Sequence, residues 1–239
     1  MPANAGIHGR TTPPTMKNLL LAWSGGKDAA WTLHLLRARD DVRVVGLLTT
    51  VTEDHGRVAM HGIRRDVLHA QAAAVGLPLL ESTIRAGCDN AAYEAAFAAT
   101  LGEARDRWPG LDTIAYGDLK LADVRQWRAE LCERHGWKIE TPLFGADTAQ
   151  LAREMIEGGL KTRLCCVDTT QLDARYAGRA FDRTLLDDLP DSCDPCGEDG
   201  EFHTLVHAGP MFGHPLQLEE GETVLHDDRF AFTDFELRI

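Results

Sequence analysis

The segment Ser24–Asp28, of sequence SGGKD, combines residue types suited to binding phosphate. Two glycines allow the backbone to approach an anion closely, and Lys27 adds a positive charge. The segment lies between an apolar run and a stretch of helical periodicity, so the free N–H groups of a helix N-terminus would point at the same anion. The chain contains neither GxxxxGK[ST] nor GxGxxG, which excludes a Walker-type loop and a dinucleotide fingerprint. The segment therefore predicts a phosphate-binding loop of another kind, and a glycine turn with a charge at the helix N-terminus is the alternative interpretation.

A second polar group follows a predicted strand further along the chain. The motif YGD at residues 116–118 closes that strand, and Arg125 and Arg128 lie three residues apart on the next predicted helix. Ligands of open parallel sheets bind at the carboxyl ends of the strands, so we expect Asp118 to face whatever binds over the glycine loop. For the two arginines alone, a solvated helix face with Asp–Arg pairs is the alternative interpretation.

The third group is the segment 196–206, of sequence CGEDGEFHTLV. It gathers carboxylates, a histidine and a threonine around two glycines. A turn does not require this many polar side chains. Glu201 and His203 share one face if Glu201 begins a strand, and such a set can hold magnesium or transfer protons. A tight acidic hairpin loop with an exposed histidine is the alternative.

Alternating strands and helices must position these groups. Short apolar strands alternate with helical segments up to about Phe144, which predicts a doubly wound parallel sheet. The predicted strands span residues 18–23, 42–51, 77–83, 112–118 and 137–144, and the predicted helices span residues 27–41, 63–76, 91–108 and 122–136.

The pattern changes in the last third of the chain. One more helix at 148–159 and one more strand at 161–170 are followed by turns and by antiparallel strands at 201–209 and 223–239. We therefore expect a flexible leader at residues 1–16, a nucleotide-binding domain at 17–145 and a smaller α+β domain at 146–239.

The composition excludes several classes of protein. With 25 Lys and Arg against 37 Asp and Glu, the formal net charge is −12, which argues against an autonomous nucleic-acid binder. No apolar run is long enough to cross a membrane. The six cysteines are too sparse for a disulfide scaffold, and Cys165-Cys166 with Cys193-x-x-Cys196 is a poor zinc set, so we expect a cytoplasmic protein with reduced thiols.

The SGGKD segment resembles the PP-loop of the ATP pyrophosphatase superfamily, whose members cleave ATP between the α and β phosphates. Ala29 stands where that loop usually has a second serine. The three segments in this order resemble the ATP-binding family that includes diphthine-ammonia ligase, over about residues 19–212. The final motif of the ligases resembles GEGGEYETLV, whereas this chain has GEDGEFHTLV. The resemblance is thus closer to a bacterial branch, which has been suggested to act near cobalamin metabolism.

This resemblance implies both a fold and a reaction. The fold would be a Rossmann-like parallel sheet of the adenine nucleotide α-hydrolase-like (PP-loop) type with a smaller C-terminal α+β domain. The reaction would use ATP and Mg²⁺ to adenylate a small-molecule carboxylate, release pyrophosphate and form an amide with ammonia or an amine.

The resemblance also implies roles for individual residues. Those expected to contact the nucleotide are Ser24, Gly25, Gly26, Lys27, Asp28, Thr49, His61 and Gly117, with Asp28 also on the metal. Those expected to act in catalysis are Lys27, Asp118, Glu201 and His203. Those expected to bind the acceptor substrate are Arg125, Arg128, Glu198, Glu201 and Thr204.

Two other functions stay open at this point. Ala29 in the phosphate loop favours an ATP-binding regulatory module without turnover. A PP-loop enzyme that modifies RNA is the second, although the acidic charge and the lack of a basic RNA-binding module count against it. A homodimer is also left open.

Overall fold

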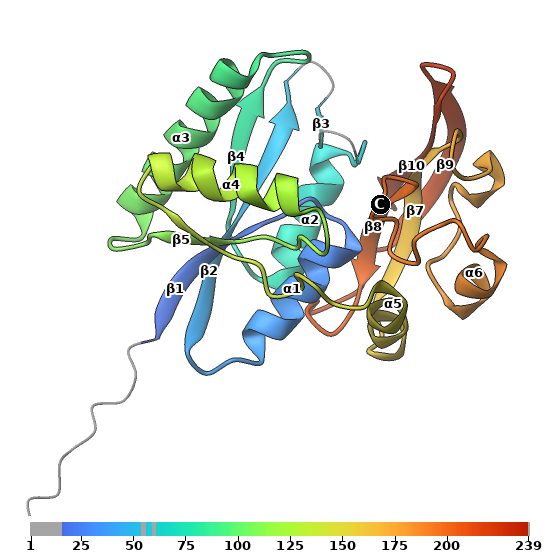
Figure 1. The fold of residues 1–239 in the computed structure, drawn as a ribbon, viewed down its shortest axis with the longest axis horizontal. Helices are drawn as coiled ribbons and strands as arrows, with labels where there is room; N and C mark the ends of the chain where they lie inside the picture. Colours follow the sequence, from blue (N-terminus) through green and yellow to red (C-terminus); the bar gives the residue numbers. More distant parts are fainter. Residues whose placement is uncertain (1–15, 54–55, 59–60, 239) are drawn as a thin grey trace, which may run out of the picture.

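Two β-sheets, one mainly parallel and one antiparallel, lie side by side in the molecule (Figure 1). The computed structural model describes residues 16–53, 56–58 and 61–238. The predicted leader at residues 1–16 therefore lies outside the described residues, apart from Met16.

The first sheet has β1 at its centre, and its parallel strands follow the order β4-β2-β1-β5-β6. These strands are Leu79–Ile84, Val42–Thr52, Lys17–Ala22, Thr113–Ala115 and Lys138–Glu140. A short strand, β3 (Arg57–Val58), pairs antiparallel with the end of β2. Leu19, Leu20 and Leu21 in β1 are fully buried, because helices cover both faces of the sheet.

Two pairs of helices cover those faces (Figure 1). They are α1 (Lys27–Arg37) and α2 (Arg65–Val75) on one face, and α3 (Asn90–Arg107) and α4 (Ala122–Arg134) on the other. Leu20, Leu48 and Leu80 pack with Phe97 and Leu101 of α3. The alternate side chains of the strands point the other way, toward α1 and α2.

The second sheet is antiparallel, with the order β8-β7-β10-β9. Its strands are Phe202–Ala208, Lys161–Asp168, Phe230–Leu237 and Leu218–His226. The accompanying helices are α5 (Thr148–Glu157), α6 (Arg183–Asp188) and the 3₁₀ turn η1 (Ala174–Tyr176). Asp227 and Asp228, both with φ of 52°, form the turn from β9 to β10, as hairpin turns of the primed type require.

The two sheets share one hydrophobic core. Leu21 of β1 and Leu33 of α1 belong to the same buried cluster as Phe202 and Leu205 of β8. Ion pairs also join the two sheets, because Arg57 and Arg64 both pair with Asp234 of β10. The second sheet is thus held against α1 and α2, beside the loop that follows β1.

The predicted fold class, a parallel α/β sheet followed by a smaller domain, is confirmed. Three elements were not predicted, namely β3, η1 and α6, because they are too short to show a period. The strands predicted at 112–118 and 137–144 end earlier, at Ala115 and Glu140. No helix in the described part of the chain is long and apolar enough to cross a membrane.

Candidate active site

The strand order of the first sheet reverses between β1 and β5. The chain runs from β1 to β2 and β4 on one side, and then returns to β5 and β6 on the other. Open α/β sheets bind their ligands at such a point, beyond the carboxyl ends of the strands. Residues 24–28 follow β1 and residues 116–118 follow β5, so two of the predicted segments meet at this edge.

Gly25 shapes the loop after β1. Its φ of 82° is a left-handed value that favours glycine, and a Cβ there would lie 2.7 Å from Gln71 Oε1. The Gln71 amide nitrogen donates to the carbonyl oxygens of Gly25 at 3.0 Å and Val206 at 2.6 Å. Its amide oxygen accepts from the Trp23 indole at 3.1 Å. Gln71 therefore holds the loop against β8.

The N-terminus of α1 receives its cap from the other sheet. Gly26 precedes the helix and offers no side chain, but the Lys27 N–H donates to Thr204 Oγ1 of β8 at 3.0 Å. A Cβ at Gly26 would lie 3.3 Å from His61 Nε2 and 3.3 Å from Ser24 Oγ. Three predicted residues, Ser24, His61 and Thr204, thus surround the positive end of this helix.

Lys27 and Asp28 form a partly buried ion pair at this helix end. Their Nζ and Oδ2 atoms are 2.8 Å apart, and the Lys27 side chain is only 4% exposed. Burial opposes the ammonium charge, but Asp28 and the nearby Cys196 and Glu198 outweigh it and raise the pKa of Lys27. Lys27 is therefore a permanent positive charge. The other oxygen of Asp28, Oδ1, is buried and has no partner among the described residues.

Gly117 brings the loop after β5 into contact with α1. A Cβ at Gly117 would lie 2.8 Å from the carbonyl carbon of Asp28. Asp118 pairs with Arg128 of α4, whose guanidinium lies 4.7 Å from the centre of the Tyr116 ring. The second oxygen of Asp118, Oδ2, is buried and lacks a partner within the described residues. Asp28 and Asp118 thus each offer one free acceptor.

The loop of residues 193–201 closes over this edge from the second sheet. Asp194 Oδ2 accepts from Lys120 at 3.2 Å and from Thr148 at 3.0 Å, and Lys120 also reaches Asp199 at 2.8 Å. The buried Glu201 accepts from the N–H groups of Asp194 at 2.7 Å and Asp199 at 2.9 Å. Glu201 precedes β8, and both of its oxygens shape the loop.

Glu198 is the carboxylate of this loop with the most perturbed protonation. Burial and the negative charge of Asp28 raise its pKa to about 7, even though Lys27 lies close by. A carboxyl with this pKa can exchange a proton near neutral pH. Cys193 and Cys196 beside it are buried free thiols, and burial raises the pKa of each to about 12.

His203 of β8 lies against His61, with ring centres 4.7 Å apart. Burial and the positive charge of Lys27 lower the pKa of His203 to about 4. The imidazole is therefore neutral at physiological pH, so it can donate or accept a hydrogen bond but carries no charge.

Thr49 and Arg125 are the predicted residues still to be placed. Thr49 of β2 is 3% exposed, and its hydroxyl lacks a partner in the part of the chain that the structure describes. Arg125 donates to Thr141 at 3.0 Å, and its guanidinium lies 4.7 Å from the centre of the Phe144 ring. Arg128 thus lies beside the site through its pair with Asp118, whereas Arg125 contacts the segment that follows β6.

Sequence reasoning missed three residues that build this site. Gln71 looks like one more polar residue in an Ala-rich helix, and Lys120 and Asp194 lie outside the motifs that we singled out. Their roles depend on pairing across 46 to 135 residues of chain, which no local pattern contains.

Comparison with known proteins identifies the family of this chain. Residues 16–139 match the diphthamide synthase N-terminal domain, and residues 147–236 match the diphthamide synthase C-terminal domain. The chain belongs to the diphthamide synthase family. The two family domains correspond to the parallel and the antiparallel sheet.

Two curated proteins are similar to this chain over most of its length. Diphthine–ammonia ligase of Schizosaccharomyces pombe is 27% identical over 223 residues, which are 85% of this chain but 36% of the relative. Diphthine–ammonia ligase of Danio rerio is 27% identical over 235 residues, which are 89% of this chain and 91% of the relative.

Proposed function

We propose that this protein is an ATP-dependent ligase that joins ammonia or an amine to a small carboxylic acid, with release of AMP and pyrophosphate. The observation that carries the proposal is the partly buried Lys27–Asp28 pair at the N-terminus of α1, placed where the strand order reverses. Backbone N–H groups, the helix dipole and a permanent positive charge there suit the phosphates of ATP. The names of the two relatives support a ligase.

The chemistry of two carboxylates at this edge suits magnesium. Asp28 Oδ1 and Asp118 Oδ2 are buried acceptors without partners among the described residues. Mg²⁺ is commonly held by one or two carboxylates together with phosphate oxygens, and it would neutralise the charge of the leaving pyrophosphate. The described residues contain no set of three or more His, Cys, Asp or Glu side chains arranged for a metal, so the ion would arrive with the nucleotide.

In the first step the acceptor carboxylate attacks the α phosphorus of ATP. A carboxylate O–P bond forms, the bond to the β-phosphate oxygen breaks, and pyrophosphate leaves with its electrons. Lys27 offsets the charge that develops on the phosphate oxygens, and Gly25 and Gly26 allow the backbone to approach them. Thr204 and Gln71 keep the loop in place throughout.

In the second step ammonia attacks the carbonyl carbon of the acyl-adenylate. A C–N bond forms, the C–O bond to AMP breaks, and one proton leaves the nitrogen. We assign the acceptance of this proton to Glu198, because its pKa of about 7 fits the task and it lies near Asp28. Glu201 instead holds the loop that carries Glu198. His203, neutral beside the helix end, serves as a hydrogen-bond partner.

The test is to incubate the protein with α-labelled ATP, magnesium and an ammonium salt, with and without a small-molecule extract of its host, and to resolve AMP from ADP. The extract should be fractionated for carboxylic acids, cobalamin-related acids included. AMP that depends on the extract supports the ligase, and ADP overturns it.

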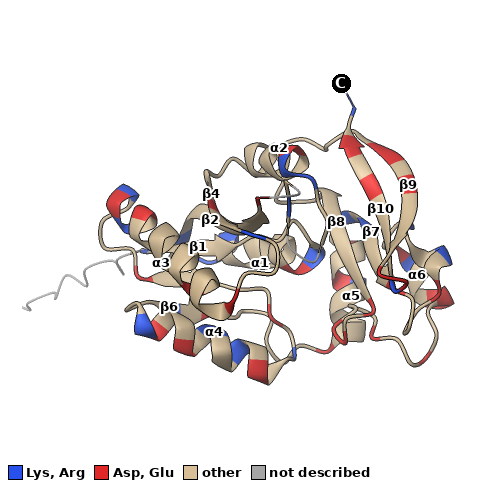
Figure 2. Ribbon diagram, turned by 90° about the horizontal axis from the view of Figure 1, so that it is seen from above, with Lys and Arg blue, Asp and Glu red and all other residues tan. Residues whose placement is uncertain are grey.

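The two alternatives predict other outcomes of the same assay. A regulatory module would be stabilised by ATP against thermal unfolding without forming AMP, and the buried Ala29 favours it because no hydroxyl is present at that position. An RNA-modifying enzyme would form AMP only when host RNA is added to the same reaction in place of the small-molecule extract. Acidic residues dominate the β9–β10 hairpin, and positive and negative side chains alternate along α4, so neither surface favours RNA (Figure 2).

The six unpaired cysteines suit the cytoplasm.

A further inference from the structure

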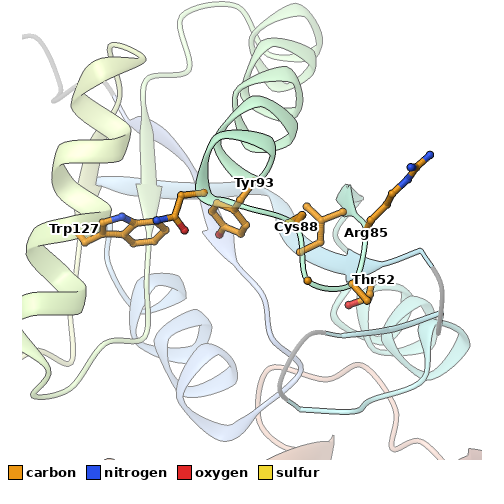
Figure 3. A pocket seen from close by; sticks show the side chains of 9 residues that line it. Thr52, Arg85, Cys88, Tyr93 and Trp127 are labelled. Atoms are coloured by element: carbon orange, nitrogen blue, oxygen red, sulfur yellow. The ribbon is translucent and has the colours of Figure 1, made fainter.

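A cavity lies at the same edge of the parallel sheet as the site around Lys27, on the face covered by α3 and α4. It measures about 300 Å³ and is lined by the ends of β2 and β4, the loop after β4 and one face of each of these helices. Figure 3 shows Tyr93 of α3 and Trp127 of α4 on one side of it, and Thr52, Arg85 and Cys88 on the other. None of these residues takes part in the site around Lys27.

Two aromatic rings are the main feature of this cavity. The ring centres of Tyr93 and Trp127 are 5.8 Å apart and the rings are tilted by 43°. Trp127 is 41% exposed, which is unusual for so large an apolar side chain and leaves its face open to a ligand. Rings in this arrangement favour a planar group that stacks against them.

The charge of the lining selects the sign of the ligand. Arg85 stands at the rim, is exposed, and forms no ion pair with another described residue. The remaining side chains of this lining carry no formal charge, so Arg85 favours an acidic ligand. Ala86 and Gly87 keep the rim open, because they present little side chain.

Hydroxyl groups follow the ends of β2 and β4 beside this cavity. Thr50 pairs with Ser82, and Thr52 pairs with Ile84, across the parallel strands β2 and β4. These four side chains share the face of Leu48 and Leu80, which packs on α3. Ser82 is 1% exposed, and its hydroxyl has no partner within the described residues. Since Ala22 pairs with Leu48, the loop after β1 begins level with Thr50.

We propose that this cavity is the subsite for the acceptor, and that the acceptor is a small carboxylic acid with an aromatic or heteroaromatic ring. The ring lies against Tyr93 and Trp127, and the carboxylate lies at the rim beside Arg85. This assignment of an acceptor rests on the proposed ligase function, whereas the binding of an aromatic acid does not.

Cys88 offers a reporter in the cavity wall. It is the one partly exposed cysteine, since the other five are buried. Its alkylation by iodoacetamide can be followed by mass spectrometry of the intact protein, with Cys88→Ser as the variant that should not be labelled. Benzoate and nicotinate are the probes, cyclohexanecarboxylate is the saturated control of equal charge, and α,β-methylene-ATP is the nucleotide control.

We expect benzoate or nicotinate to slow the alkylation of Cys88, and cyclohexanecarboxylate and the ATP analogue to leave it unchanged. Trp127→Ala should weaken this protection by about tenfold, as the loss of an aromatic contact allows. Trp127→Phe should retain most of it. Phe144→Ala removes another exposed ring, 37% exposed and outside the cavity, and should have no effect.

Three results would overturn the proposal. The first is alkylation that neither aromatic acid slows in the unaltered protein. The second is equal protection by cyclohexanecarboxylate, which would remove the rings from the recognition. The third is protection of Cys88 by the ATP analogue in the unaltered protein that is lost in Trp127→Ala. This result would mean that the cavity binds the adenine ring of ATP. Because the assay detects binding, protection without AMP formation would count against the ligase alone.

Discussion

The Thr204 hydroxyl accepts a hydrogen bond from the Lys27 N–H at 3.0 Å, across 177 residues of chain. This contact places the antiparallel sheet at the positive end of α1, where it supplies the cap that Gly26 lacks. The binding loop therefore depends on both parts of the molecule.

Replacing Thr204 with valine should destabilise the protein and weaken its binding of ATP. The substitution preserves the shape of the buried side chain but leaves the Lys27 N–H without an acceptor, which costs about 1 kcal/mol. Thr204→Ser keeps the hydroxyl and should behave like the parent. Urea unfolding and isothermal titration with α,β-methylene-ATP measure both effects, and equal stability of the two variants would contradict this role of Thr204.

Lys27→Met should weaken ATP binding by about tenfold to a hundredfold, because a buried charge–phosphate contact is lost. The same variant leaves Asp28 unpaired and should unfold at lower temperature. Lys27→Met combined with Asp28→Asn removes both charges, so it should recover stability but not ATP binding. Lys138→Met, which changes a lysine with a 70% exposed side chain, is the control. Unchanged ATP affinity in both Lys27 variants would exclude the phosphate role.

The protonation of Glu198 predicts two opposite dependences on pH. Its folded pKa of about 7 lies above the usual 4.5, so the folded state holds the proton more tightly and loses stability as pH rises between these values. Glu198→Gln should therefore unfold at a higher temperature than the parent above pH 7, and not below pH 4.5. Amide formation should instead rise with an apparent pKa near 7 in the parent and lose that step in the variant. A step that survives in Glu198→Gln would assign the proton transfer elsewhere.

Asp28→Asn should raise the magnesium concentration needed for half-maximal AMP formation by about tenfold or more, since a charged ligand becomes neutral. Asp118→Asn should act in the same direction, and it also breaks the pair with Arg128. Asp123→Asn changes an exposed aspartate on α4 and serves as the control. Identical magnesium dependence in all three variants would remove both carboxylates from the metal site.

Most of the fold, and part of the site, could be predicted from the sequence. The run Leu19–Leu21 predicts a strand buried on both faces, and the glycines after it predict the turn into α1, because both signals are local. Glu201 shows the limit of that reasoning. Its motif predicts chemistry, but the structure turns both of its oxygens toward the N–H groups of Asp194 and Asp199. The partners of a carboxylate depend on how the loop closes, and a sequence pattern does not contain that.

The contact between Gly117 and Asp28 predicts the effect of a single methyl group. In Gly117→Ala the new Cβ would lie 2.8 Å from the backbone of Asp28, which cannot move without shifting α1. We expect a loss of about 1–3 kcal/mol in the free energy of unfolding, together with weaker binding of ATP. Gly102→Ala adds the same group in α3 where nothing lies within 4 Å, so it should stabilise the protein slightly. Denaturant unfolding of both variants separates steric contact from the general effect of replacing glycine, and similar changes in the two would mean that the loop after β5 is free to move away from α1.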